Sequence, residues 1–251
     1  MAMELKELQV IAGERGFDLE TIVKDYYLTL LLHRLSGINR LCFKGGTALN
    51  KICFNHIRLS EDLDFSVKGS IGTVETQIRR ALGQEKEFVK VTHDKKTKQF
   101  VRLLVHYETA LKPDYIIVDL NQKASIRLKP EEKEVKHFYR GKIPKFSIRT
   151  LNFEELVAEK VSAAFQRNAP RDYYDLYNII IRRMFINERL VKQKLKEHGQ
   201  RFDISRLFKP GSRVYSRWEA DLLPLTKTKP SWKKVIKKIA EYFKYRKNPL
   251  S

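Results

Sequence analysis

The chain has 251 residues, of which 42% are hydrophobic, so it is long enough for one large domain or two modest ones with a sizeable core. Lysine and arginine number 50 against 30 aspartates and glutamates, a formal charge of +20. No apolar run approaches the roughly 18 residues of a membrane-spanning helix, and the N-terminus MAMELKELQV lacks the apolar core of a signal peptide. We therefore expect a soluble, cytoplasmic protein with no membrane partner.

Cysteine and histidine favour neither a metal site nor a disulfide framework. Cys42 and Cys53 do not form a CxxC pair, and the six histidines are scattered without HxH or HExxH spacing. We expect both cysteines to be small buried side chains.

The first elements alternate between helix and strand. Apolar residues recur at helical spacing over 19–35, which predicts an amphipathic helix. Residues 41–43 then read as a short strand, and the pair Gly45-Gly46 turns the chain into a helix over 47–55. Residues 63–67 are again strand-like. This alternation favours an α/β domain.

A helix and three β-rich runs follow. Ile71, Val74, Ile78 and Leu82 mark a helix over 71–82. The apolar runs 88–92, 100–107 and 115–120 are separated by the turn-like segments HDKKTK and ALKPD, so we expect an antiparallel meander. Together with the earlier strands it makes a mixed sheet covered by helices.

The chain then changes character. Residues 123–145 are polar and charged and contain two prolines and a glycine, which is typical of a linker. We expect an α/β domain over 1–125, a linker over 126–150 and a helical, basic domain over 151–251. The last domain should contain four helices, at 153–166, from Pro170, at 187–198 and at 231–246.

The positive charge is concentrated at the end of the sequence. Residues 182–251 contain 20 basic and 6 acidic side chains, a net charge of 20 minus 6, or +14. Such a field attracts phosphate backbones through counterion release, whatever the base sequence. We expect this region to bind a nucleic acid, with a merely solvated lysine-rich surface as the alternative.

Two carboxylates stand out in this basic chain. Residues two apart in a strand point to the same face, so Asp62 and Asp64 project together while Leu63 and Phe65 face the core. Neighbouring carboxylates repel unless a proton or cation lies between them, and oxygen ligands suit Mg²⁺, which substrate phosphates complete. The pair is a candidate metal site for phosphoryl transfer. The alternative is an ordinary turn cap.

Asp119 is the candidate for a third carboxylate. It lies in the apolar run YIIVDLNQ, where burying an unpaired charge would be costly. The alternative is an edge strand that exposes Asp119 to solvent.

The glycine turn FKGGTALNK has the pattern of neither a P-loop nor a dinucleotide fold. It does combine a strand, a turn, a hydroxyl and a helix start, and backbone N–H groups at such a start can hold a phosphate. Thr47 could add a hydrogen bond. The alternative is a Gly-Gly turn that serves tight packing.

Four pieces of the chain carry a resemblance. They occur in this order from about Lys24 to Tyr177, namely VKDYYLT, FKGGTALNK, RLSEDLDF and EELVAEKVSAAFQRNAPRDYYDLY. A glycine turn, an RxSxDxD strand and a third strand acid form the general layout of the nucleotidyltransferase-β superfamily. More narrowly, the four pieces resemble the AbiEii family of nucleotidyltransferase toxins from abortive-infection and type IV toxin/antitoxin systems.

The resemblance implies roles for particular residues. Catalytic roles fall to Asp62, Asp64, Lys160 and Asp172, with Lys160 near the triphosphate. Contacts to the nucleotide triphosphate fall to Gly45, Gly46, Thr47 and Ser60. Metal binding, by Mg²⁺ or Mn²⁺, falls to Asp62, Asp64 and Asp119, of which Asp119 fits the family pattern most loosely.

The residues alone leave purely structural interpretations of the later motif open. Asp172 and Asp175 lie one turn apart near a helix start, where acids also stabilise the helix dipole. Lys160 could equally be a surface lysine.

The function that these expectations favour is metal-dependent transfer of a nucleoside monophosphate from an NTP to RNA. The family implies the 3′ end of tRNA as acceptor, and a cognate antitoxin that does not have to bind this chain. The alternative is a non-catalytic nucleic-acid-binding module whose acids are structural. A nuclease of the PD-(D/E)xK type is disfavoured, because PDYIIVDLNQK has Asn121 where that motif needs a carboxylate.

Overall fold

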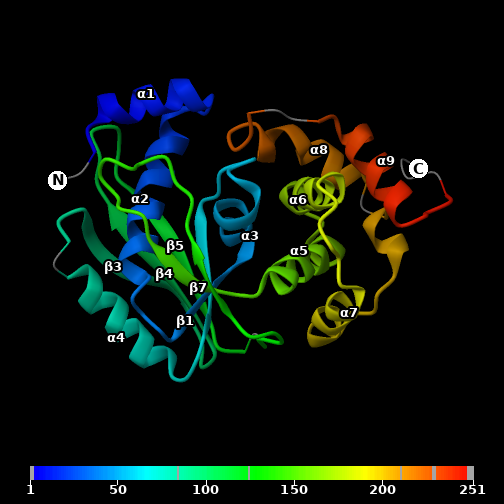
Figure 1. The fold of residues 1–251 in the computed structure, drawn as a ribbon, viewed down its shortest axis with the longest axis horizontal. Helices are drawn as coiled ribbons and strands as arrows, with labels where there is room; N and C mark the ends of the chain where they lie inside the picture. Colours follow the sequence, from blue (N-terminus) through cyan, green and yellow to red (C-terminus); the bar gives the residue numbers. More distant parts are fainter. Residues whose placement is uncertain (1–2, 84, 124, 210, 228–229, 248–251) are drawn as a thin grey trace. The chain divides into compact units, whose positions relative to one another are not determined.

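The computed structural model describes residues 3–83, 85–123, 125–209, 211–227 and 230–247 (Figure 1). The remaining positions, which the predicted domains include, lie outside the described residues. The chain divides into two compact units, residues 1–152 and 153–251, called unit 1 and unit 2 below. Unit 1 is built around a sheet and the described part of unit 2 is helical, so the predicted fold class is confirmed.

Unit 1 contains a seven-stranded mixed sheet with the strand order β3-β4-β5-β2-β1-β7-β6. The pairs β3/β4 and β4/β5 are antiparallel, which confirms the predicted meander. Strand β2 pairs parallel with β5 and antiparallel with β1. The strands are β1 (Leu41–Lys44), β2 (Asp62–Val67), β3 (Phe88–Lys96), β4 (Phe100–Tyr107), β5 (Asp114–Asn121), β6 (Glu131–Glu134) and β7 (Ser147–Thr150).

The structure differs from the expected linker over 126–150. Strands β6 and β7 lie in this stretch, and β7 pairs with β1 through Thr150 and Phe43. Between the two strands Tyr139 and Ile143 are completely buried, so the segment belongs to the core of unit 1. The expected turn HDKKTK is also shorter, because β3 continues to Lys96 past an irregularity in its register.

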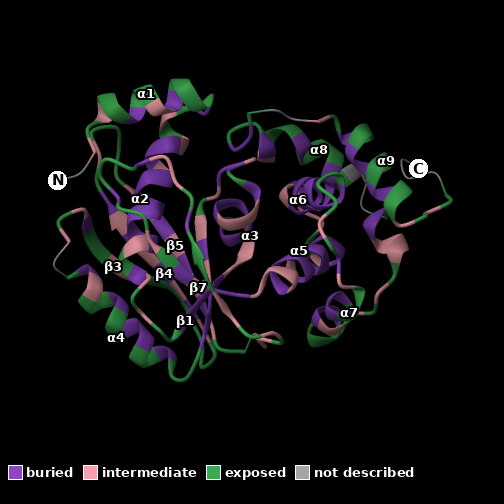
Figure 2. Ribbon diagram, viewed as in Figure 1, coloured by how far each residue is buried: buried purple, intermediate pink, exposed green. Residues whose placement is uncertain are grey.

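Helix α2 (Leu19–Leu35) has the bounds that the sequence predicts and is mostly buried, as Figure 2 shows by its colour. Asp18 caps its N-terminus by accepting a hydrogen bond from the Thr21 N–H. Helix α1 (Leu5–Arg15) packs against α2, and α4 (Ile71–Leu82) lies where the sequence places it.

The helix after the glycine turn has an unusual form. It begins as α3 (Gly45–Ala48) and continues as a π-helix over Leu49–Phe54, which ends at Asn55 in the left-handed conformation. π-Helices are rare in proteins, and those that do occur are often found at functional sites.

Unit 2 contains α5 (Phe153–Arg167), α6 (Pro170–Ile181), α7 (Glu188–Glu197), a 3₁₀-helix (Ile204–Leu207), α8 (Gly211–Leu222) and α9 (Trp232–Tyr242). Helix α6 packs against α5, α8 and α9. Among the described residues of the whole chain, no helix is both long enough and apolar enough to cross a membrane.

Candidate functional site

A row of charged residues crosses one face of the sheet in unit 1. Lys44 on β1 lies opposite Asp64 on β2, Asp64 lies beside Asp119 on β5, and Asp119 lies opposite Arg102 on β4. Residues paired in this way point to the same face. The sheet therefore places two carboxylates between two cations, and we call these four residues the charged row.

Asp62 precedes Asp64 by two positions on β2, so it projects to the same face. Both side chains are partly exposed, whereas Leu63 and Phe65 between and beside them are completely buried. The sequence prediction of a shared carboxylate face is borne out by this alternation. Two partly exposed carboxylates with hard oxygen atoms suit a divalent ion that keeps waters and takes up substrate phosphates.

Gly45 lies directly against this carboxylate face. Its φ of 77° lies in the left-handed region, and a Cβ atom built on it would be 2.1 Å from the Oδ2 atom of Asp64. Only a residue without a side chain fits there. The glycine turn therefore lies close enough to the Asp64 carboxylate for a ligand to contact both.

Thr47 is buried, and its hydroxyl donates to the backbone carbonyl of Asp62 over 2.5 Å. This bond fastens the glycine turn to the carboxylate strand. The carbonyl of Gly46 accepts a hydrogen bond of 2.9 Å from the Asn50 side chain. Ser60, just before β2, accepts a hydrogen bond of 2.8 Å from the buried Arg58.

Asp119 is engaged by Arg102. Two parallel hydrogen bonds of 2.8 Å join the Arg102 guanidinium to the two oxygens of the carboxylate. The bond to Asp119 raises the pKa of Arg102, and Asp62 and Asp94 add to this effect. Strand β5 lies inside the sheet, so the alternative of an edge strand is wrong.

The described residues contain no group of three or more His, Cys, Asp or Glu side chains placed to hold a metal ion. The two carboxylates of β2 share one face and are partly exposed, and their oxygen atoms suit a divalent metal. A third ligand from Asp119 would require Arg102 to release it.

A buried ion pair behind the glycine turn was missed by the sequence reasoning. Lys51 Nζ lies 2.7 Å from Asp25 Oδ1 and 2.9 Å from the Thr29 hydroxyl, and both charged side chains are only 2% exposed. The Tyr139 hydroxyl donates to the other oxygen of Asp25 over 2.9 Å. These bonds join α2 to the π-helix that follows the glycine turn. Both charged residues lie in pieces of the family resemblance, which was the available signal.

His56 lies just beyond this helix and is 6% exposed. Burial lowers its pKa to about 3, and the positive charge of Lys51 acts in the same direction. Its Nε2 atom lies 3.0 Å from the carbonyl of Lys136. The imidazole is therefore neutral at physiological pH.

In unit 2 the predicted Lys160 and Asp172 are direct partners. Lys160 Nζ lies 2.9 Å from Asp172 Oδ1 and 3.0 Å from Asp175 Oδ2, and all three side chains are buried. The surface-lysine alternative is therefore wrong. Arg167, which is 66% exposed, approaches Asp172 to 3.4 Å.

Comparisons with known proteins agree with the fold and the motifs. The sequence matches the family model for the nucleotidyl transferase AbiEii toxin of type IV toxin/antitoxin systems over residues 30–244. No curated protein sequence matches the chain.

Two solved structures are similar to this one. MenT4, a nucleotidyltransferase toxin from Mycobacterium tuberculosis H37Rv, is 23% identical with a TM-score of 0.70, covering 98% of this chain and 91% of that one. JHP933 from Helicobacter pylori is 17% identical with a TM-score of 0.60, covering 90% of each chain. At these identities the likeness shows the fold. The family model covers most of the sequence, and the chain belongs to the AbiEii family of nucleotidyltransferase toxins of type IV toxin/antitoxin systems.

Proposed function

We propose that this toxin transfers a nucleoside monophosphate from an NTP to an RNA acceptor, with the 3′ end of tRNA as its target. The observation that supports this most strongly is the carboxylate pair Asp62 and Asp64, which shares one face of β2 beside a glycine turn. In the reaction the acceptor hydroxyl loses its proton to solvent and its oxygen bonds to the α-phosphorus, while the bond from the α-phosphorus to the bridging oxygen breaks and pyrophosphate leaves.

Asp62 and Asp64 hold the divalent metal, Mg²⁺ or Mn²⁺. A metal held there would lower the pKa of an attacking hydroxyl and would neutralise charge on phosphate oxygens. The lysine at position 44 stands opposite Asp64 and keeps the local charge from becoming strongly negative before the nucleotide arrives. Arg102 does the same for Asp119.

The glycine turn holds the triphosphate. Backbone N–H groups of Gly46 and Thr47 begin a helix and are suited to phosphate oxygens, and the absent side chain of Gly45 leaves the approach to Asp64 open. The Thr47 hydroxyl positions this turn through its bond to the Asp62 carbonyl. Ser60 adds a further polar contact for the nucleotide.

Lys160 and Asp172 take part in the same reaction, as the family resemblance implies. Their ion pair also stabilises the fold of unit 2, because Lys160 neutralises the buried Asp175 as well. Two variants separate these roles, since Asp172→Asn and Asp175→Asn each remove one carboxylate from the same lysine. If Asp172 is catalytic, its variant alone abolishes transfer although both are destabilised.

RNA is the acceptor that the charge favours, because residues 182–251 have a net charge of 20 minus 6, or +14. Modification of the tRNA 3′ end would block aminoacylation and so explain toxicity. The cognate antitoxin then acts without having to contact this chain.

The test is incubation of the full chain with each α-labelled NTP, Mg²⁺ and total tRNA, followed by electrophoresis. The proposal expects labelled, lengthened RNA with wild type and none with Asp62→Asn. Asp94→Asn is the matched control, because this exposed aspartate lies 3.9 Å from Arg102 without belonging to the pair. Shortened RNA would indicate a nuclease. No transfer with any NTP would count against the proposal.

A further inference from the structure

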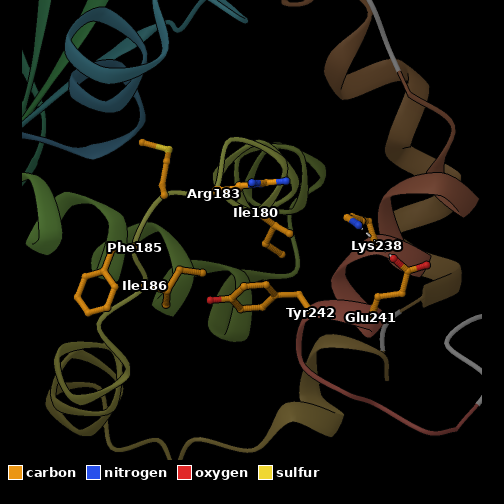
Figure 3. A pocket seen from close by; sticks show the side chains of 8 residues that line it. Ile180, Arg183, Phe185, Ile186, Lys238, Glu241 and Tyr242 are labelled. Carbon is orange, nitrogen blue, oxygen red and sulfur yellow. Dashed lines mark hydrogen bonds and ion pairs between the residues drawn. The ribbon is translucent and has the colours of Figure 1, made fainter.

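Unit 2 contains a pocket of about 520 Å³ between the end of α6, the segment that follows it, and α9 (Figure 3). This volume is in the range of small-molecule sites. The side chains that matter here are Ile180, Arg183, Phe185, Ile186, Lys238 and Tyr242. We call this the α6/α9 pocket.

Both aromatic rings that line the pocket are exposed. Phe185 is 62% and Tyr242 44% exposed, although each has buried neighbours in the chain, such as Ile186 and Ile239. Figure 3 shows the Tyr242 hydroxyl directed toward Ile186. Folding alone gives no reason to leave two large rings in water around a hollow, so the pocket has the character of a binding surface.

The two segments that form the pocket are strongly basic, and Arg183 and Lys238 line the pocket itself. Helix α9 and residues 180–186 together carry four lysines and two arginines against one acid, Glu241, and all six cations are exposed. Glu241 is already paired with Lys238 at 3.2 Å. Burial raises the pKa of Tyr242, and the charge of Glu188 on α7 acts in the same direction. Glu188 is itself paired with Lys192 at 3.2 Å.

Arg183 occupies a backbone position that favours glycine. Its φ is 54°, and the Arg183 N–H bonds to the Ile180 carbonyl while the Met184 N–H bonds to the Ile179 carbonyl. This is the Schellman arrangement at a helix end, in which the left-handed residue is usually glycine. An arginine there costs backbone strain, and strained positions cluster at functional sites.

The Arg183 side chain is also unused within the fold. It makes no hydrogen bond or ion pair with the part of the chain that the structure describes, and it lines the pocket. A strained position thus presents a guanidinium beside two exposed rings.

We propose that the α6/α9 pocket receives an unpaired base of a single-stranded RNA segment, stacked on Phe185 and Tyr242, with Arg183 bound to the adjoining phosphate. The inference rests on the proposed function only in taking RNA as the acceptor. Aromatic platforms within a basic groove are how proteins hold single strands without reading their sequence. An apolar peptide would use the rings but gives no reason for Arg183 and Lys238 beside them, and a second copy of this chain would bring like charge to like charge.

The experiment measures binding of a fluorescent single-stranded RNA 12-mer and of a blunt RNA duplex by anisotropy, with the full chain and without NTP or metal. Truncating a ring that stacks on a base weakens single-strand binding by about 5- to 150-fold. We expect such a loss for Phe185→Ala and for Tyr242→Ala. Tyr215→Ala is the matched control, because this α8 tyrosine is 65% exposed outside the pocket, and it should bind like wild type.

Arg183→Gly gives a second, independent readout. It relieves the left-handed strain, so its melting temperature should equal or exceed that of wild type. It also removes one phosphate contact, so RNA binding should weaken. The slope of log K against the logarithm of the salt concentration should become shallower by about 1. A variant that is at least as stable and yet binds RNA less well cannot be explained by a packing role.

Several results would overturn the pocket assignment. They are wild-type affinity in both ring variants, an equal loss for the duplex and the single strand, or a changed oligomeric state in sedimentation with unchanged RNA affinity. The binding assay is independent of catalysis, because Asp64→Asn should bind RNA like wild type. If wild type fails to transfer nucleotides and the ring variants still lose RNA affinity, the pocket stands and only the proposed function fails.

Discussion

The substitution Gly45→Ala perturbs the contact between the glycine turn and the carboxylate strand. The new Cβ atom would lie 2.1 Å from Asp64 Oδ2, 2.8 Å from Cγ and 2.9 Å from Cβ. Ordinary contacts begin near 3.4 Å. The Asp64 carboxylate therefore has to move by 3.4 minus 2.1, or about 1.3 Å, because the turn is tied to β2 by Thr47.

This displacement has different consequences for activity and for stability. A misplacement of about 1 Å in a reacting constellation can reduce the rate about 100-fold, so we expect at least that loss in nucleotide transfer. A non-glycine residue in the left-handed region costs about 1–2 kcal/mol, which a domain with about 5–15 kcal/mol of stability tolerates. The variant should therefore be folded and nearly inactive.

The assay compares transfer rates from an α-labelled NTP with the free energy of unfolding in urea. Gly37→Ala is the control, since a Cβ atom there meets nothing within 4 Å, and it should match wild type in both measurements. Transfer by Gly45→Ala at a rate close to that of wild type would refute the reasoning. It would mean that the Asp64 carboxylate need not stay where the structure places it.

Three further predictions concern the supports of the site. Lys51→Met leaves Asp25 charged and buried, so the free energy of unfolding in urea should fall by about 3–5 kcal/mol. Adding Asp25→Asn to this variant should recover part of the loss. A loss below about 1 kcal/mol would contradict the structural role. The pKa of His56 is lowered to about 3 in the folded state. As the pH falls below about 6.5, the unfolded chain therefore binds a proton at His56 that the folded chain does not bind. Stability should therefore be lost by up to about 1.4 kcal/mol for each pH unit between about 6 and 3 and be fully present above that range, and His56→Gln should flatten this slope in urea titrations at several pH values. Arg102→Gln removes the cation that occupies Asp119, so the Mg²⁺ concentration for half-maximal transfer should fall by up to about fivefold for this partly exposed pair; a rise would instead make Arg102 a ligand of the nucleotide.

Regular periodicity made much of the fold predictable. Helices 19–35 and 71–82 were foreseen to the residue, because their apolar positions repeat with one period from end to end. Strands β6 and β7 were missed because their four-residue sequences, EEKE and SIRT, contain too few alternating apolar positions to signal a strand. Their place in the sheet depends on partners far away in the sequence.

The carboxylate face was predictable for the same local reason, since Asp62 and Asp64 are two residues apart. The ion pairs of Asp119 and Asp25 were not predictable in this way. Arg102 reaches Asp119 from the neighbouring strand, 17 residues away in the sequence, and Lys51 reaches Asp25 from 26 residues away. The contact between Gly45 and Asp64 needs the antiparallel register of β1 and β2, which no local pattern contains.

The central claim is that Asp62 and Asp64 hold the divalent metal that binds the NTP. Equilibrium dialysis of a labelled, non-hydrolysable NTP analogue with and without Mg²⁺ tests it most directly. Wild type and Asp94→Asn should bind the analogue more tightly with Mg²⁺ than without it, and the combined variant Asp62→Asn and Asp64→Asn should lose this difference. Metal-dependent binding that persists in the combined variant would contradict the account.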